Sequence, residues 1–265
     1  MRPVLRFFFL MAIPLFLNGC ATSGYKTFYE GYFDPSKYED EVRTLGDSEE
    51  PEVFTSNNLE RDVRIMRSRN YSVVGVSSFN GAYEDLANAK AQAKRVGATM
   101  VLVKSAYTDT QTHSTTLFLP DSQTTYYSGS AYGSGGYAYG SGTATTYGTK
   151  AVPVTSTQRR YDQTAVYFVP YKEKPRFGFQ AAPLTPAQRR DLDRNTGVLM
   201  EVIIEDTPFF YSNVLPGDVL IEFYGQPVRS VDELMATLDQ VPQDADTVDI
   251  TVIRKGDEKE ISVEM

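Results

Sequence analysis

Residues 122–149 place the strongest limit on the architecture of this chain. The segment consists almost entirely of Ser, Thr, Gly, Tyr and Ala, and it contains no aliphatic side chain larger than Ala. Such a segment cannot bury enough apolar area to offset the entropy lost on ordering it. We therefore predict a long disordered loop, within a wider low-complexity region at about residues 108–158. The apolar runs at residues 99–103 and 161–170 are then the strands of a hairpin that has this loop at its tip.

The region before the loop contains alternating helix and strand signals. Asn57, followed three residues later by Glu60, is typical of a helix start. Residues 71–77 are rich in strand formers, and residues 83–96 have an apolar stripe at helical spacing. Together with the first strand of the hairpin, these signals predict a βαβ unit. We assign a small α/β domain to residues 52–170, interrupted by the loop.

The first twenty residues are typical of a secretory signal. Arg2 and Arg6 precede an apolar run at residues 7–17, which is shorter than the about 20 residues that a membrane-spanning helix needs. The run ends in Leu17-Asn18-Gly19-Cys20, which resembles the lipobox of bacterial lipoproteins. The chain has one cysteine, so it cannot form an intramolecular disulfide. The alternative is an ordinary secretory signal in which the cysteine is incidental.

The lipobox resemblance implies a lipid-anchored protein of the cell envelope. Residues 1–19 would be removed as a signal peptide, and Cys20 would carry diacylglycerol and an amide-linked acyl chain such as palmitate, which suffices for stable anchoring. Ala21 follows the cysteine, and by analogy with enterobacterial sorting it favours the outer membrane, facing the periplasm. We interpret residues 20–51 as a tether, whose aromatic side chains lie at the membrane interface or dock on the domain.

Residues 171–265 have the turn and strand signals of a second domain. In Leu215-Pro216-Gly217-Asp218, Pro and Gly stand where a type II turn requires them, and an apolar strand follows. A second tight turn, Tyr224-Gly225-Gln226-Pro227-Val228, comes next. Ser230 with Glu233 then forms a capping box at the start of a helix.

This order of motifs resembles the PDZ domain of HtrA-type periplasmic proteases, a partly open β-barrel with two helices. The resemblance covers residues 175–265 and brings no protease domain with it. It implies that the loop Arg176-Phe177-Gly178-Phe179 holds a peptide's terminal carboxylate, while the peptide adds a strand along the following edge. Gly178 allows the backbone to approach closely. Leu234 and Leu238, with Phe177 and Phe179, would line the side-chain pocket; the alternative is that these four are ordinary core residues.

Charge and residue content disfavour several other function classes. The chain has 26 basic and 34 acidic residues, for a formal charge of −8, which disfavours general nucleic-acid binding. His113 is the single histidine, and it lies in the polar region. No cluster of Cys, His and acidic residues has metal-ligand spacing, and the glycine-rich stretch has no phosphate-binding motif. We therefore expect no catalytic residues, no metal and no cofactor.

The sequence as a whole predicts a membrane-anchored envelope lipoprotein whose PDZ domain binds extended peptides or protein C-termini. It would act as an adaptor or a sensor. Its partners would be a protein or peptide in the PDZ groove and the lipid bilayer at acylated Cys20, with no nucleic acid. Two alternatives remain open: a structural or surface-adhesion lipoprotein that acts through the tyrosines of residues 122–149, and a hydrolase whose nucleophile is not evident.

Overall fold

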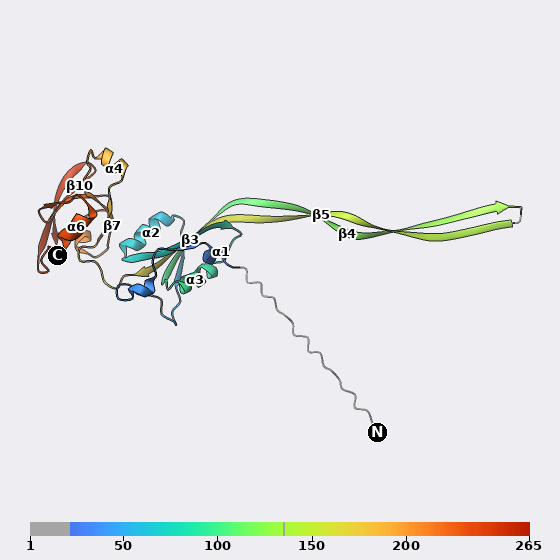
Figure 1. The fold of residues 1–265 in the computed structure, drawn as a ribbon, viewed down its shortest axis with the longest axis horizontal. Helices are drawn as coiled ribbons and strands as arrows, with labels where there is room; N and C mark the ends of the chain where they lie inside the picture. Colours follow the sequence, from blue (N-terminus) through green and yellow to red (C-terminus); the bar gives the residue numbers. More distant parts are fainter. Residues whose placement is uncertain (1–21, 135) are drawn as a thin grey trace, which may run out of the picture.

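The computed structural model describes residues 22–134 and 136–265, so the signal peptide, the lipobox and Cys20 lie outside the described residues. Figure 1 shows two domains side by side and a long β-ribbon that projects from the first of them. The fold is a mixed α+β arrangement, as predicted. Within the described residues, no helix combines the length and the apolar character needed to cross a membrane.

The N-terminal domain is built on a sheet whose described strands follow the order β1-β3-β5-β4-β2. These strands are β1 (Tyr29–Gly31), β2 (Glu52–Thr55), β3 (Tyr71–Gly81), β4 (Met100–Gly133) and β5 (Gly136–Pro170). β2 pairs with β4 in parallel, and β5 lies between β3 and β4, antiparallel to both. The predicted βαβ unit is therefore split, because the returning strand of the hairpin lies between its two strands.

Helices cover both faces of this sheet. They are α2 (Leu59–Ser68) on one face and α3 (Leu86–Arg95) on the other. Successive residues of β4 alternate between the two cores: Met100 packs with Met66 of α2, whereas Val101 packs with Ala93 of α3. β4 is therefore buried on both faces, and the domain has three layers: α2, the sheet and α3.

Residues 24–42, which we predicted to belong to a tether, are instead packed on the N-terminal domain. They form α1 (Gly24–Thr27), β1 and the 3-10 helix η1 (Pro35–Tyr38). The side chains of Tyr25 and Val42 are buried, with exposed fractions of 0% and 2%, and both belong to the core on the α3 side of the sheet. Burial of these apolar side chains holds the segment against the domain. Of the two alternatives, the structure therefore favours the one in which the aromatic side chains of the segment dock on the domain.

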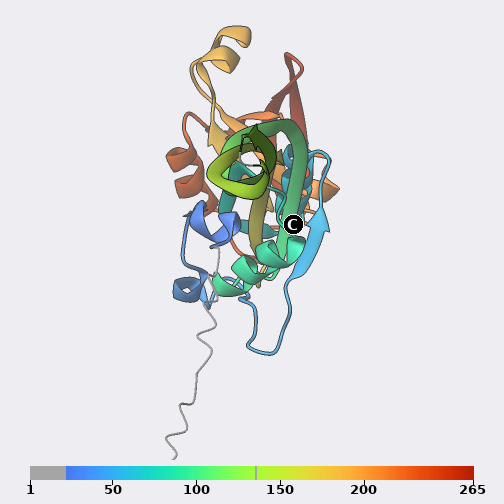
Figure 2. The same cartoon turned by 90° about the vertical axis from the view of Figure 1, so that its right-hand side faces the viewer.

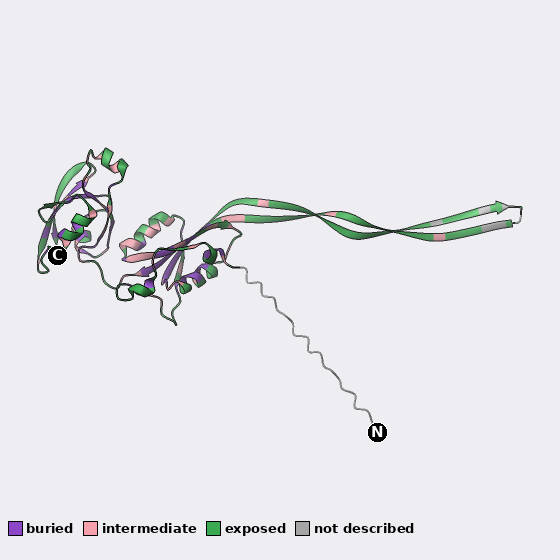
Figure 3. Ribbon diagram, in the orientation of Figure 1, coloured by how far each residue is buried: buried purple, intermediate pink, exposed green. Residues whose placement is uncertain are grey.

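The region predicted to be a disordered loop forms a two-stranded antiparallel ribbon. Pairing continues from Asp109 opposite Arg160 to Gly133 opposite Gly136. At about 3.4 Å per residue, the 34 residues of β4 extend for about 115 Å. Nearly all the described residues of the ribbon are exposed (Figure 3). Seen along its length, the ribbon coils (Figure 2). The lack of apolar side chains excludes a core but does not exclude backbone pairing between strand-forming Thr and Tyr residues.

The C-terminal domain has a second sheet, with the described order β11-β10-β8-β7-β6 and β9 paired to β8. The strands are β6 (Phe179–Pro183), β7 (Val198–Ile203), β8 (Val219–Phe223), β9 (Gln226–Pro227), β10 (Thr247–Arg254) and β11 (Asp257–Glu264). The helices are α4 (Pro186–Asp191), α5 (Pro208–Tyr211) and α6 (Val231–Leu238). The sheet curves around the larger of the domain's two buried clusters, and β6 and β11 form its two ends, so it remains open.

An ion pair holds the turn before β8. Arg254 donates from Nε to Oδ1 of Asp218 at 2.7 Å and from Nη2 to Oδ2 at 2.6 Å. The Asp218 side chain is only 2% exposed, and its Oδ2 also accepts from the backbone N–H of Leu215 at 2.9 Å. The neighbouring carboxylate raises the pKa of the Arg254 guanidinium. The pair thereby ties the Pro-Gly turn to β10.

Candidate functional site

The loop before β6 requires glycine at position 178. Gly178 has a φ of +82°, in the left-handed region, and a Cβ built there would lie 1.9 Å from Oγ1 of Thr207. Thr207 is itself held in place, because its hydroxyl donates to the carbonyl of Ile204 at 2.6 Å. Both the backbone conformation and the space therefore exclude any side chain at this position.

The strand that follows this loop has an unpaired edge. β6 pairs with β7, and no described strand pairs with its other side. The backbone N–H of Ile204 donates to the carbonyl of Gly178 at 2.8 Å, and Phe179 lies opposite Ile203. Because antiparallel strands alternate hydrogen-bonded and non-hydrogen-bonded pairs, the N–H and C=O of Phe179 point toward the open side.

Three of the six candidate site residues lie in the hydrophobic core. Leu234 of α6 is fully buried, and Phe177 and Phe179 are 5% and 9% exposed. The Phe179 ring stacks on the Phe209 ring with centroids 4.9 Å apart, and the Phe177 ring meets the Phe223 ring edge-on at 5.3 Å. By packing in the core, these side chains hold the loop in place.

Apolar side chains of α6 other than the two predicted ones are also accessible. Leu238 is half-buried against the core. Met235 is 49% exposed, and Val231, one helical turn before it, is half-buried. α6 contacts β6, so this helix lies beside the open strand. The hydrophobic spacing in the sequence identified the helix but not which of its apolar side chains stay accessible.

Arg176 is already engaged within the domain. Its Nη1 donates to the carbonyl of Val241 at 2.9 Å, and its Nη2 donates to the carbonyl of Pro242. The guanidinium carbon also lies 5.2 Å from the centre of the Phe177 ring. Arg176 therefore fastens the loop to the residues after α6 through both of its Nη groups.

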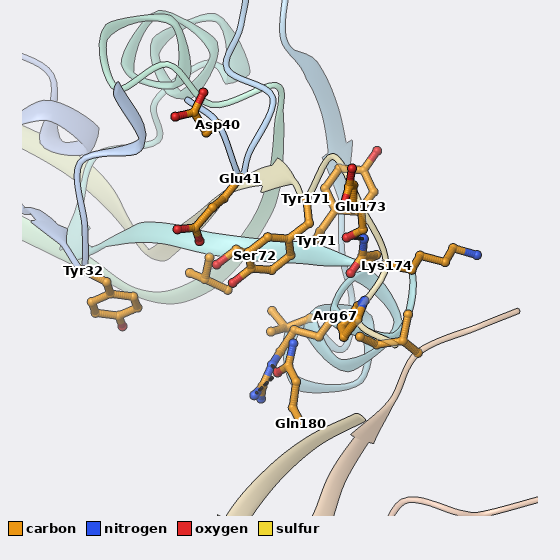
Figure 4. A pocket seen from close by; sticks show the side chains of 15 residues that line it. Tyr32, Asp40, Glu41, Arg67, Tyr71, Ser72, Tyr171, Glu173, Lys174 and Gln180 are labelled. Atoms are coloured by element: carbon orange, nitrogen blue, oxygen red, sulfur yellow. Dashed lines mark hydrogen bonds between the residues drawn. The ribbon is translucent and has the colours of Figure 1, made fainter. Parts of the chain in front are cut away.

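The junction between the domains was not predicted. Arg67 of α2 donates from Nε and Nη2 to Oε1 of Gln180 on β6, at 3.0 and 2.6 Å. Its Nη2 also forms an ion pair with Glu201 of β7 at 2.7 Å. Figure 4 shows Arg67 and Gln180 side by side. The two residues are far apart in the sequence, and no local pattern marks their contact.

Cavities lie on both sides of α2 at this junction. One, of about 770 Å³, is lined by Tyr71, Tyr171 and Lys174 together with Gln180 (Figure 4). A second, also of about 770 Å³, is lined by α2 together with Leu199 and Pro216 of the C-terminal domain, among others. The N-terminal domain therefore borders β6 at Gln180 and β7 at Leu199.

The structure assembles no group of side chains with metal-binding chemistry from the residues it describes. No set of three or more His, Cys, Asp and Glu residues there could hold a metal ion. His113 lies on the exposed ribbon, opposite Ser156.

Comparison with known proteins identifies the C-terminal domain. Residues 175–265 match the PDZ domain family model. A probable periplasmic serine endoprotease DegP-like from Marinomonas sp. (strain MWYL1) is 35% identical over 77 residues, which make up 29% of this chain and 16% of that protein. The match thus spans a small part of that curated relative.

Solved structures of PDZ-containing proteins are also similar. The PDZ domain of HtrA3 bound to a phage-derived ligand is 17% identical with a TM-score of 0.29, covering 33% of this chain and 81% of that one. The PDZ domain of EpsC from Vibrio cholerae is 15% identical with a TM-score of 0.27, covering 35% of this chain and 100% of that one. On the family match, residues 175–265 form a PDZ domain, and its sequence is similar to that of an HtrA-type periplasmic protease.

Proposed function

We propose that the PDZ domain binds an extended peptide ending in a free carboxylate, and that the peptide adds as a strand to the open edge of β6. One observation carries this proposal. The left-handed loop residue Gly178 is followed directly by Phe179, whose backbone donor and acceptor point away from the sheet. Backbone N–H groups of the loop would hold the carboxylate, and the strand pairing would supply affinity for any sequence.

The last side chain of the peptide would enter the space between this loop and α6. Arg176, Phe177, Gly178, Phe179, Leu234 and Leu238 remain our candidate residues for this site. We propose that Phe177, Phe179 and Leu234, which are buried, form its floor. Because Met235 is accessible and lies one turn after Val231, we add both as the residues of α6 that contact the peptide.

We further propose that the chain is a lipoprotein anchored through acylated Cys20, with its PDZ domain in the periplasm and the outer membrane as the favoured site. In this position it would act as an adaptor or as a sensor of exposed C-termini. The lipobox pattern and the similarity of the PDZ domain to that of a periplasmic protease support this proposal. Mass spectrometry of the mature N-terminus tests it, since an unacylated Cys20 would contradict the anchor.

Peptide binding can be tested on the full chain with a library of C-terminal peptides. We expect a Kd of about 1 µM for the best peptides, equivalent to about −8 kcal/mol, and loss of binding when the terminus is amidated. Met235→Glu should weaken binding by more than about tenfold, because it places a charge against an apolar side chain. Ala236→Glu, at the next exposed position of the same helix, is the matched control and should bind normally.

Two outcomes would contradict the proposal. Equal affinity for free and amidated peptides would exclude recognition of the carboxylate. Absence of binding to every peptide, by a chain with native circular dichroism, would exclude a working groove.

A further inference from the structure

The β-ribbon has two chemically different faces. Because side chains alternate along each strand, the pairing of Ser128 with Ser141 and of Gly129 with Gly140 assigns every ribbon position to one face or the other. One face carries the exposed aromatic side chains Phe118, Tyr126, Tyr132, Tyr139 and Tyr147. The opposite face carries the glycines Gly129, Gly140, Gly142 and Gly148 in the outer part of the ribbon, and the exposed Leu117, Leu119 and Val154 nearer its base.

The ribbon itself does not require these glycines. A Cβ built on Gly129, Gly140 or Gly148 would meet no described atom within 4 Å, and the backbone of these three is not left-handed. Glycine inside a regular element costs about 0.5–1 kcal/mol relative to alanine. Within strands it often marks a position where another backbone or a ligand approaches closely. The glycine face is therefore shaped for a contact that the described chain does not supply.

We propose that a second copy of this chain covers that face, with its own tyrosine face packed on the glycines. Tyr126, Tyr139 and Tyr147 are 80%, 66% and 83% exposed, so their rings project from the ribbon and are free to enter the space left by missing side chains. Over residues 112–157, the tyrosine face has no charged side chain, and the glycine face has one acid and one base, Asp121 and Lys150. Two copies therefore meet without repulsion, and nothing in this segment selects a charged partner.

The available area is sufficient for a specific interface. Residues 112–133 of β4 and their partners on β5 give a ribbon about 75 Å long and about 10 Å wide. One face then offers about 750 Å², and two facing copies bury about 1,500 Å² in total, the size of a stable protein–protein interface. An isolated two-stranded ribbon is at best marginally stable in water, so packing a second layer on it also stabilises the ribbon.

Because each contact joins a tyrosine face to a glycine face, the assembly is not limited to two copies. A pair of copies joined in this way still has one free tyrosine face and one free glycine face, so further copies can add. The assembly would hold several PDZ domains close together. A partner with several exposed C-termini would then bind by avidity.

Sedimentation velocity of the full chain in detergent, over a concentration series, tests the association. Wild type should form dimers and larger species. Gly129→Thr with Gly140→Thr fills the glycine face while favouring strand structure. Tyr126→Ser with Tyr139→Ser removes two rings from the other face. Each double variant should raise the dissociation constant more than about tenfold. Tyr126→Phe with Tyr139→Phe retains both rings, and it is the control that should associate as wild type does.

Mixing the two defective variants tests the arrangement of the faces. One retains its tyrosine face and the other its glycine face, so together they should form a 1:1 dimer that grows no further. A wild-type chain that stays monomeric up to about 100 µM, or a Gly→Thr variant that associates normally, would overturn the proposal. Failure of the mixture to form a dimer would overturn packing of tyrosine on glycine. A monomeric chain that binds a polysaccharide through its tyrosines would likewise overturn it in favour of adhesion.

Discussion

Arg67 of α2 donates two hydrogen bonds to the side-chain oxygen of Gln180 on β6. A helix of the N-terminal domain therefore holds the strand whose open edge we propose as the peptide site. The same guanidinium reaches Glu201 on β7, so one side chain spans two neighbouring strands. Arg67 thereby links β6 and β7 to α2, next to a second set of contacts in which Ser68 and Arg69 at the end of α2 meet Glu205 of the C-terminal domain.

Arg67→Ala should loosen the two domains relative to each other. The loss of a partly exposed ion pair and two hydrogen bonds should cost about 1 kcal/mol at the junction and leave the core of each domain intact. Small-angle scattering should show a broader distribution of distances within the chain. Arg64→Ala is the matched control, because Arg64 pairs with Glu60 inside the same helix. Identical scattering from the two variants would contradict this role of Arg67.

Gly178→Ala should abolish peptide binding and lower stability. The new Cβ would collide with Thr207, and the left-handed backbone disfavours any side chain. The loop must shift to relieve the collision, and we expect a loss of about 2 kcal/mol in the free energy of unfolding. Urea denaturation measures this loss. Gly225→Ala is the comparison, because Gly225 also has a positive φ but a Cβ there would meet no described atom within 4 Å. A smaller effect at position 178 than at 225 would refute the steric argument.

Asp218→Asn should destabilise the PDZ domain by about 3 kcal/mol. The substitution leaves the largely buried guanidinium of Arg254 without its counter-charge, and removing one partner of a buried ion pair typically costs about 3–5 kcal/mol. Chemical denaturation of the full chain measures the change. Asp232→Asn, on the exposed start of α6, should change stability by less than about 0.5 kcal/mol. A loss of similar size in both variants would show that the ion pair is not responsible.

The N-terminal domain should lose stability in alkaline solution through Tyr25. Burial, assisted by the charge of Glu84, raises the pKa of Tyr25 from 10.0 to about 12. The folded state favours the neutral phenol, so this contribution is complete below about pH 10 and is lost as the pH rises through 12. Tyr167 adds to the effect, because burial raises its pKa as well.

Tyr25→Phe provides the direct measurement. The Tyr25 hydroxyl is buried and has no hydrogen-bond partner among the described residues, so its removal should stabilise the domain by about 1 kcal/mol at pH 7. The variant should also lose less stability than wild type between pH 9 and about 11.5 in urea titrations. Tyr32→Phe, at a position that is 64% exposed, should follow the wild-type curve. Parallel curves for wild type and Tyr25→Phe would contradict the prediction.

Local sequence patterns were sufficient for much of the PDZ domain. The Pro-Gly turn before β8 and the Ser230 cap of α6 each depend on a few neighbouring residues, and each has a strong conformational preference of its own. The structure has Ser230 accepting a hydrogen bond from the N–H of Glu233, which is one half of a capping box, while the Glu233 carboxylate accepts from the N–H of Arg229 rather than that of Ser230. Such short-range rules hold without knowledge of the rest of the fold.

Other features depend on how distant segments meet. A helix turns by about 100° per residue, so only the packed structure decides that Leu234 is buried while Met235 is accessible. Composition correctly excluded a core from residues 122–149, but the register across the tip sets the glycines and the exposed tyrosines on opposite faces. The contact of Arg67 with Gln180 joins two domains and has no local signature. Long-range pairing and packing, which no short window of sequence contains, determine all three.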